Sequence, residues 1–309
     1  MTEKQIIKDR IKIKLKNIST LYNIDELIDF NVDNEYIKEY YKLNKIPYSI
    51  VHSKQGFVHF AVNKNGRYDQ RGMCFQPDFI IKHINKDKTK KVLELACGRG
   101  ANLVYLATRF PEINFEGVDL SKGQLDYAYK KTKKYNNLKI ISGDFHDLSM
   151  YKDDEFDLIY IIEALCYSTN KRKVFNEVKR VLKKEGLFII FDGYWREHDE
   201  ELVGEEKILK RLAELGMALN EFEKYSQIKK YAEEVGYELI FEEDLSNFLI
   251  PNANRFGRLS DIVFKNHFLR FILRYLLPQK ISYNSFFGYL VEDSLKMKWT
   301  KYVVSVFKK

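Results

Sequence analysis

The chain has 309 residues, of which 45% are apolar and 31% charged, as in an ordinary soluble globular protein. Its three cysteines show neither a C-x-x-C pair nor a His/Cys ligand spacing, which argues against a disulfide framework and a zinc site. No apolar run reaches the roughly 18 residues of a membrane-spanning helix. The first residues, MTEKQIIKDR, lack the apolar stretch of a signal peptide, and we therefore expect a cytoplasmic protein.

The net charge of +8 is carried entirely by residues 251–309, which hold eleven Lys and Arg against three Asp and Glu. Aromatic side chains are interleaved with these basic ones. Such a segment is typical of contact with nucleic acid, with an anionic membrane surface or with an anionic substrate. It is equally typical of the solvated face of helices that cover a core, and the composition leaves both interpretations open.

From residue 91 onward, β-rich runs alternate with helical patterns. The runs predict strands at 91–97, 113–120, 138–145, 156–165 and 186–195. Helices are predicted at 101–110, 121–134 and 171–186, the last ending on Gly186. Strand–helix alternation with crossovers of this length indicates an α/β protein whose parallel sheet is covered on both faces.

The alternation breaks after Trp195 and resumes later. A helical insertion is predicted over 199–223, followed by a helix at 228–236 and a strand at 237–245. A second insertion precedes a last strand at 301–309 and contains one strong helix candidate, 261–277, which Pro278 stops. We expect an N-terminal helical segment (1–87) and a core (88–309) that carries helical insertions at about 197–225 and 247–298.

The stretch VLELACGRGANLVYLA (92–107) leads from a strand through two glycines into a helix. In parallel sheets, ligands bind beyond the carboxyl ends of the strands, where loop glycines let the backbone approach them. The dinucleotide fingerprint G-x-G-x-x-G needs a third glycine, but Leu103 stands there, which counts against NAD or FAD. An acidic residue, Glu94, precedes Gly98 by four positions.

In these residues the sequence resembles the class I S-adenosylmethionine-dependent methyltransferases, best over about 90–195. The resemblance implies a doubly wound, seven-stranded, mostly parallel Rossmann-like sheet that binds S-adenosylmethionine and releases S-adenosylhomocysteine. It implies that Glu94 lies near the cofactor's ammonium, that Asp119 holds the ribose hydroxyls with its two oxygens, and that Asp144 and Phe145 meet the adenine. The full set that it assigns to the cofactor is Tyr41, Glu94, Gly98, Gly100, Asp119, Leu120, Asp144, Phe145 and Glu163.

Within this class, the run after the fourth strand, IIEALCYSTN, resembles the small-molecule branch, whose sterol, tocopherol, sugar and amine methyltransferases commonly read E-x-x-x-H. Tyr167 replaces that histidine, so a substrate-orienting role suits it better than base catalysis, given a pKa of about 10 for tyrosine. Asp192, at the end of the fifth strand, is the first candidate for a general base, and His59 is expected to close over the cofactor. Each has a structural alternative: Asp192 or Asp119 as a loop or helix cap, and His59 and its aromatic neighbours as packing.

No metal is expected, because His146 and Asp147 have no further ligand at a suitable spacing. The large insertions suit a small hydrophobic or anionic methyl acceptor, and the basic aromatic segment 251–309 suits peripheral membrane contact. A nucleic-acid methyltransferase is an alternative, although E-A-L-C stands where N-P-P-Y-like motifs occur. A non-catalytic cofactor-binding or scaffolding protein and a cyclopropane synthase also remain open. An oligomeric state is not indicated.

Overall fold

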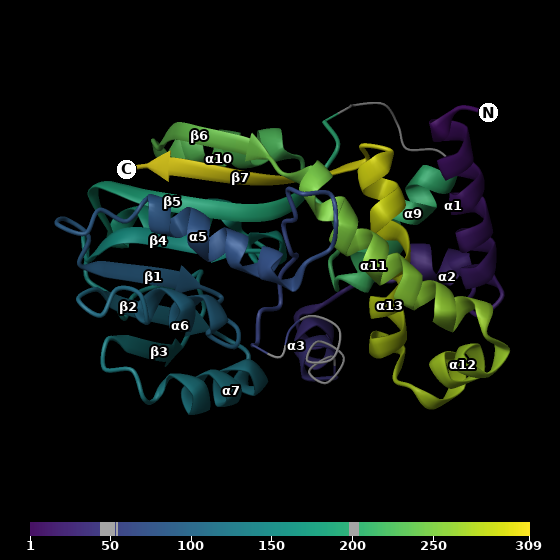
Figure 1. Ribbon diagram of the computed structural model, residues 1–309, viewed down its shortest axis with the longest axis horizontal. Coiled ribbons are helices and arrows are strands. Elements are labelled where there is room, and N and C mark those ends of the chain that lie inside the picture. Colours follow the sequence, from purple (N-terminus) through teal and green to yellow (C-terminus); the bar gives the residue numbers. More distant parts are fainter. Residues whose placement is uncertain (44–52, 54, 198–203) are drawn as a thin grey trace.

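The computed structural model describes residues 1–43, 53, 55–197 and 204–309, leaving aside the side chains of Asn34, Lys38, Tyr41 and Lys42. Figure 1 shows a twisted sheet flanked by helices and, beyond the sheet's carboxyl edge, a separate group of helices. We call this group the cap. The arrangement matters for function because the cap stands over the ends of the strands that carry the predicted site.

The sheet has seven strands in the order β3-β2-β1-β4-β5-β7-β6. Only β7 runs antiparallel to its neighbours, β5 and β6, so the predicted seven-stranded, mostly parallel sheet is confirmed. The order reverses between β1 and β4, which is where ligands bind in such sheets. The strands are β1 (Lys91–Leu95), β2 (Asn114–Asp119), β3 (Leu138–Ser142), β4 (Phe156–Ile162), β5 (Leu182–Trp195), β6 (Glu238–Asp244) and β7 (Thr300–Lys308).

Both faces of the central strands β1 and β4 are buried, and for this reason these strands read as nearly continuous apolar runs, whereas the edge strand β6 is largely exposed. Along β4, Leu158 and Tyr160 face one layer, whereas Ile159 and Ile161 face the other. The first layer contains α5 (Phe75–Lys82), α6 (Ala101–Ala107) and α7 (Lys122–Thr132), and the short helix η1 (Gln70–Cys74) leads into α5. The second layer contains η2 (Leu165–Tyr167), α8 (Lys171–Val181) and α10 (Tyr225–Val235).

The cap is assembled from three parts of the chain that are distant in sequence. Its helices are α1 (Glu3–Ser19), α2 (Ile24–Ile28), α3 (Asn34–Leu43), α9 (Gly204–Gly216), α11 (Ser246–Lys265), α12 (His267–Phe271), the π-helical turn η3 (Ile272–Leu276) and α13 (Gln279–Lys296). Most of them pack around one apolar core, to which Leu15, Leu212 and Phe286 belong. Parts of α11 and α13 also pack against the sheet, through Leu249 and Leu295 among others. Among the described residues, no helix combines the length and apolar character needed to cross a bilayer.

One buried ion pair joins the first and last of these parts. The Lys14 ammonium on α1 lies 2.7 Å from a carboxylate oxygen of Asp293 on α13, and both side chains are almost fully buried. Arg10 adds a second contact to the same carboxylate. A buried charge is tolerated only when it is paired, so these contacts tie the amino-terminal helix to α13 in one arrangement.

The prediction of a single helix over 261–277 is wrong, because the helix is interrupted at Asn266. The Asn266 backbone is extended (φ −96°, ψ 119°), and its side-chain oxygen accepts hydrogen bonds from the backbone N–H groups of Phe268 and Leu269. This asparagine therefore ends α11 and caps α12. The stop at Pro278 is confirmed, since η3 ends at Leu276 and α13 begins after the proline.

Two further helix boundaries also differ from the prediction. Helix α8 ends at Val181 rather than at Gly186, because β5 begins at Leu182 and pairs with β4 from its first residue. Helix α9 ends at Gly216 rather than near residue 223. Residues 198–203, at the start of that prediction, lie outside the described part of the structure.

Candidate active site

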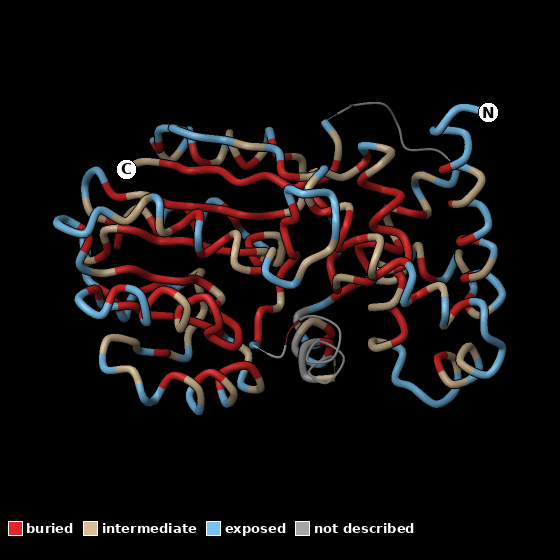
Figure 2. Tube along the Cα trace, viewed as in Figure 1, coloured by how far each residue is buried: buried red, intermediate tan, exposed pale blue. Residues whose placement is uncertain are grey.

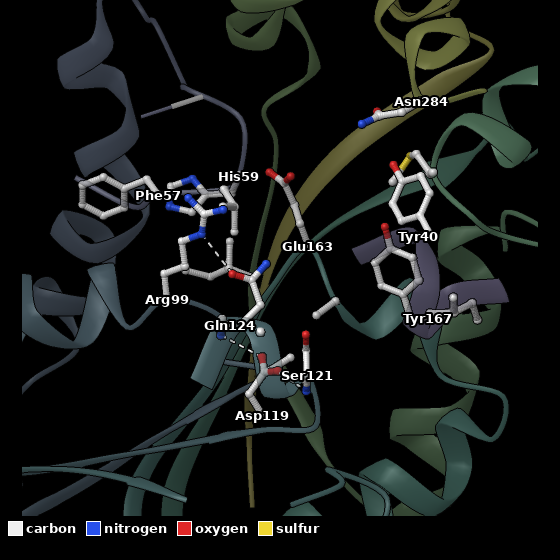
Figure 3. A pocket seen from close by; sticks show the side chains of 18 of the residues that line it. Tyr40, Phe57, His59, Arg99, Asp119, Ser121, Gln124, Glu163, Tyr167 and Asn284 are labelled. Carbon is white, nitrogen blue, oxygen red and sulfur yellow. Dashed lines mark hydrogen bonds between the residues drawn. The ribbon is translucent and has the colours of Figure 1, made fainter. Parts of the chain in front are cut away.

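A cavity of about 950 Å³ lies between the carboxyl ends of β1, β2 and β4 and the cap helices. One half, the cofactor half, is lined by loops of the sheet and includes Glu94, Gly98 and Asp119. The other half, the acceptor half, is lined by cap helices and is mainly apolar. Figure 3 shows side chains from both halves directed into the same space. Its volume is at the upper end of the range for ligand sites, which leaves room for two small molecules.

The loop after β1 brings the backbone close to the cavity. Ala96, Gly98 and Gly100 all have positive φ values of 51°, 52° and 69°, a conformation that glycine adopts without strain. Gly98 lines the cavity, as expected. Gly100 does not: it starts α6 in the left-handed conformation, and a Cβ atom there would meet Thr132 at 3.3 Å. The second glycine therefore serves the turn into α6 rather than the ligand.

Leu103 takes the place of the third glycine because the neighbouring strand provides the space. Gly117 on β2 has no side chain, and a Cβ atom there would lie 2.4 Å from Leu103 and 2.7 Å from the Cys97 sulfur. The close helix–strand approach of the dinucleotide fingerprint is thus achieved with the glycine on β2. A glycine inside an apolar strand was the sequence signal for this contact.

Asp119 links the end of β2 to the loop after β1. Its Oδ2 accepts a hydrogen bond from the Gly98 N–H at 2.8 Å, and its Oδ1 accepts one from the Ser121 N–H at 2.7 Å. Burial raises the pKa of Asp119, and these two donors act in the opposite direction. The capping interpretation is therefore observed, yet each oxygen keeps a second lone pair that can accept from a hydroxyl. Leu120, next to it, is exposed at the cavity rim.

Glu94 is a buried acid with an unused oxygen. Its Oε1 accepts from the Asn102 side-chain amide at 2.9 Å, whereas its Oε2 has no hydrogen-bond partner among the described residues. Burial raises the pKa of Glu94 to about 8. A buried acceptor of this kind calls for a cation or a strong donor. An ammonium group has three donors and no acceptor, so it fits this position.

His59 is 4% exposed and lines the cavity beside Phe57, with ring centroids 5.4 Å apart. Its Nδ1 lies 3.1 Å from the Phe60 carbonyl oxygen and its Nε2 lies 3.2 Å from the Asn102 side-chain oxygen. Burial lowers its pKa. Both facing atoms are acceptors, so the neutral ring donates to one of them, either the Phe60 carbonyl oxygen or the Asn102 side-chain oxygen. The structure thus places His59 beside Asn102, the partner of Glu94.

The sequence reasoning missed several cavity residues at the cofactor half, among them the polar side chains of Arg99, Asn102 and Gln124. Arg99, only 2% exposed, donates from Nε to Gln124 Oε1 at 3.0 Å, and its guanidinium lies over the Tyr127 ring at 5.2 Å. Asn102 is the partner of Glu94 described above. Arg99 stands between the two motif glycines, where the sequence alone offered no reason to expect a buried cation.

The loop after β3 carries Asp144 and Phe145, and both line the cavity. Asp144 Oδ1 accepts from the His146 N–H at 2.9 Å and lies 2.7 Å from the His146 Nδ1. His146 Nε2 in turn lies 2.7 Å from the Ser168 hydroxyl. This histidine, which the sequence singled out only to dismiss as a metal ligand, connects the loops after β3 and β4. Among the described residues no cluster could hold a metal ion.

Glu163 stands where the two halves of the cavity meet (Figure 3). It follows β4 with a positive φ of 50°. Its Oε1 accepts from the Phe60 N–H at 2.8 Å, which attaches the segment before α5 to the sheet. Burial, and to a lesser extent the nearby Asp192 carboxylate, raises the pKa of Glu163 to about 8.

Asp192 does not line the cavity, which corrects the expectation that it faces the same cleft as a general base. Its carboxylate is 2% exposed and accepts hydrogen bonds from the backbone N–H groups of Cys166 and Gly193, at 2.9 and 2.8 Å. Burial raises its pKa to about 6. The alternative, a carboxylate that holds the loop after β4, is the arrangement observed.

Two tyrosines face the acceptor half, Tyr167 on η2 and Tyr40 on α3 (Figure 3). The Tyr40 hydroxyl donates to the Gly216 carbonyl oxygen at 2.8 Å, which fixes its ring against α9. Tyr41, the residue expected at the cofactor, has a side chain outside the described part of the structure. Most of the stretch 47–54 between them and His59 is likewise not described.

Comparison with known proteins agrees with this geometry. Residues 86–242 match a methyltransferase domain family. Sterol 24-C-methyltransferase erg-4 of Neurospora crassa is 24% identical over 248 residues, which cover 79% of this chain and 65% of that protein. The chain therefore spans slightly less than two thirds of this relative's length.

Two solved structures share the fold across almost their whole length. Mycolic acid cyclopropane synthase CmaA1, complexed with S-adenosylhomocysteine and CTAB, has a TM-score of 0.73 at 12% identity, covering 88% of this chain and 97% of that chain. Geranyl diphosphate C-methyltransferase of Streptomyces coelicolor, also with S-adenosylhomocysteine, has a TM-score of 0.65 at 15% identity, covering 89% and 96%.

The family match covers half of the chain and includes the strands β1 to β5 that carry Glu94, Gly98, Asp119, Asp144 and Glu163. S-adenosylmethionine is the cofactor of this family, and the residues found fit it: a buried acid with an unused oxygen, a backbone loop open to the cavity and a carboxylate with free lone pairs. The chain belongs to the methyltransferase domain family, within the class I S-adenosylmethionine-dependent methyltransferases.

Proposed function

We propose that the protein transfers a methyl group from S-adenosylmethionine to a small, predominantly apolar and uncharged molecule held in the acceptor half of the cavity. The observation that carries this proposal is the continuity of one cavity from Asp119 at the sheet to the cap helices. Cofactor and acceptor can then meet without water between them. The relatives named above act on sterols and on geranyl diphosphate, which supports an isoprenoid-like acceptor; of these two, the sterol is the uncharged one.

The lining of the acceptor half favours an apolar acceptor over an anionic one. Its side chains include Ile37, Met217, Phe256, Val263 and Phe287. Among the residues that the structure describes, the Lys and Arg side chains that line the cavity are Arg99 and Lys122, and both belong to the cofactor half. An anion in the acceptor half would lose its hydration without gaining a cation, at a cost of several kcal/mol.

Each end of the cofactor has a partner in this arrangement. Glu94 Oε2 would accept from the ammonium, Asp119 from the ribose hydroxyls, and Asp144 with Phe145 would hold the adenine. When bound, S-adenosylmethionine supplies a methyl carbon that carries the electrophilic charge of a sulfonium. Aromatic rings stabilise such a cation by about 0.5–2 kcal/mol, and Tyr40, Tyr167 and Phe57 present rings to the cavity.

Glu163 is the group best placed to accept a proton from the acceptor. Of the described acids that line the cavity, Glu94, Asp119 and Asp144 belong to the cofactor half, and Glu163 stands at the junction. A pKa of about 8 is close to the optimum for proton transfer near neutral pH. The Phe60 N–H holds one of its oxygens in place, so the carboxylate is positioned before substrate binds.

A direct test uses S-adenosylmethionine labelled on the methyl group and a fractionated lipid extract. We expect label in an apolar product and none in RNA or DNA. Tight cofactor binding without turnover on any fraction would instead indicate a non-catalytic cofactor-binding protein. Label in nucleic acid, with binding that weakens steeply as salt rises, would indicate the nucleic-acid alternative.

A further inference from the structure

One corner of the cap, formed by α12 and η3, exposes an unusual concentration of large apolar side chains. On α12 and η3, Phe268 and Tyr275 are each 70% exposed, Leu276 is 64% exposed and Phe271 is 52% exposed. Positions 268, 271 and 275 follow the spacing of one helix face, and the rings of Phe271 and Tyr275 lie 5.2 Å apart. Figures 1 and 2 show this segment projecting at that corner of the cap.

The same region is basic. Residues 258–280, which we call the cap tip, contain five Lys and Arg and a single Asp. Lys265 contacts that acid, Asp261, at 3.0 Å, and the Arg274 guanidinium lies 5.7 Å from the centre of the Tyr275 ring. Positive charge beside exposed aromatic and aliphatic side chains is the composition of a surface that inserts shallowly into an anionic lipid layer.

The cap tip is also continuous with the wall of the cavity. Leu259 and Val263 on α11, Leu273 on η3 and Ile281 on α13 line the acceptor half. Leu273 is buried although Phe271 and Tyr275, on either side of it, are exposed. Leu259 is at once a lining residue and 41% exposed. The segment from α11 to η3 therefore presents one side to the cavity and the other side to solvent.

We propose that the cap tip docks on the surface of an anionic lipid bilayer, so that an apolar acceptor passes from the lipid into the cavity between α11, η3 and α13. The entry of the acceptor rests on the proposed function, whereas the docking does not. The positive charge accounts for attraction to the headgroups, and Phe268, Phe271 and Tyr275 account for insertion among the first carbons of the lipid chains.

The test is co-sedimentation of the full chain with vesicles, with no methyl acceptor present. We expect binding to vesicles that mix phosphatidylcholine with phosphatidylglycerol, much weaker binding to pure phosphatidylcholine, and release as salt rises. Phe268→Ser, Phe271→Ser and Tyr275→Ser combined should reduce partitioning about tenfold or more. The single variant Phe268→Ser, at the most exposed position, should show part of the same loss.

The matched control is Ile6→Ser with Ile13→Ser on α1, two residues that are 50% and 60% exposed outside the cap tip. It should bind vesicles like the unaltered chain. S-adenosylhomocysteine affinity and thermal unfolding, measured for every variant, report folding. Equal binding to neutral and anionic vesicles, or unchanged binding by the triple variant, would overturn the docking proposal. A third outcome would also overturn it: no binding to vesicles, together with a dimer in sedimentation velocity that becomes a monomer in the triple variant. None of these outcomes bears on the proposed methyl transfer, which the labelled-cofactor assay tests alone.

Discussion

The two halves of the cavity are built by opposite means. The cofactor half is formed by loops that follow consecutive strands, and its polar atoms are engaged by nearby backbone, as when Asp119 accepts from Gly98 and Ser121. The acceptor half is formed by helices from three distant parts of the chain, and it is lined mainly by apolar side chains. The first half is suited to one ligand with fixed donors and acceptors. The second selects by shape and apolarity, which allows the acceptor to differ among proteins of one fold.

The substitution expected to weaken cofactor binding most is Asp119→Ala. The change leaves the Gly98 and Ser121 N–H groups without their acceptor, at about 1–3 kcal/mol each, and removes the proposed ribose contact. We expect affinity for S-adenosylhomocysteine to fall at least about 100-fold in isothermal titration calorimetry. Asp126→Ala, an exposed acid on α7, is the control and should bind normally. Unchanged affinity in Asp119→Ala would show that the site assignment is wrong.

Glu163→Gln separates chemistry from binding at the junction of the halves. The amide oxygen can still accept from the Phe60 N–H, but the side chain can no longer take a proton. We expect kcat to fall by about 100-fold or more, as for loss of a general base, while S-adenosylhomocysteine affinity changes less than about tenfold.

The pH profile of the unaltered enzyme gives the second half of that test. With a pKa raised to about 8, Glu163 is the active base only when ionised, so kcat should rise with pH up to about 8. If Glu163→Gln keeps both the rate and the rise, the proton acceptor is a different group or no base is required.

Gly216→Ala addresses the acceptor half. A Cβ atom at this position would lie 2.6 Å from the Phe287 backbone nitrogen, so α9 and α13 would have to separate. We expect a loss of about 1–3 kcal/mol in the free energy of unfolding and a raised KM for the acceptor, with cofactor affinity unchanged. Gly193→Ala, where nothing lies within 4 Å, is the matched control. Equal effects of the two changes would contradict the tight contact between α9 and α13.

The smallest expected effect is the release of a proton when the cofactor binds. Burial holds Glu94 largely protonated at pH 7, with a pKa of about 8, and an ammonium at its free oxygen would lower that pKa. Binding of S-adenosylhomocysteine should therefore release a fraction of a proton and tighten as pH rises from 6 to about 8. Titration in buffers of different ionisation enthalpy measures this release. Glu94→Gln should abolish it, and a release that persists in that variant would place the titrating group elsewhere.

The same acids set the pH dependence of stability in the free protein. The pKa of Glu94 and Glu163 is raised in the folded state, so each contributes stability that is present below the ordinary pKa of a glutamic acid and is lost as pH rises through about 8. The contribution of these two acids to the thermal unfolding midpoint of the cofactor-free chain should accordingly fall from about pH 4.5 to about pH 8 and level off above that pH. Bound S-adenosylhomocysteine should reduce the part of this decrease that comes from Glu94, because its ammonium group lowers the pKa of that acid.

Much of the cofactor half was predictable, because its signals are local in the chain. Strand runs, the G-x-G turn and the acids at strand ends lie within a few residues of one another, and parallel pairing brings all such ends to one edge. The local pattern does not tell whether the carboxylate at a strand end points into the cavity or accepts hydrogen bonds from a neighbouring loop. Glu163 follows β4 and Asp192 lies within β5, both in apolar runs. The positive φ at Glu163 directs its side chain into the cavity, while the loop after β4 covers the Asp192 carboxylate.

The sequence by itself determined the α/β class, the sheet with its glycine turn, and the polar residues that we propose to meet the cofactor, since periodicity and turn chemistry are properties of neighbouring residues. Only the tertiary structure decided the rest. It placed Gly117 against Leu103, broke the predicted helix at Asn266, and brought α1, α9 and α13 together around Lys14 and Asp293. Those contacts join residues up to 279 positions apart, and packing at such separations depends on shape and burial that no local pattern records.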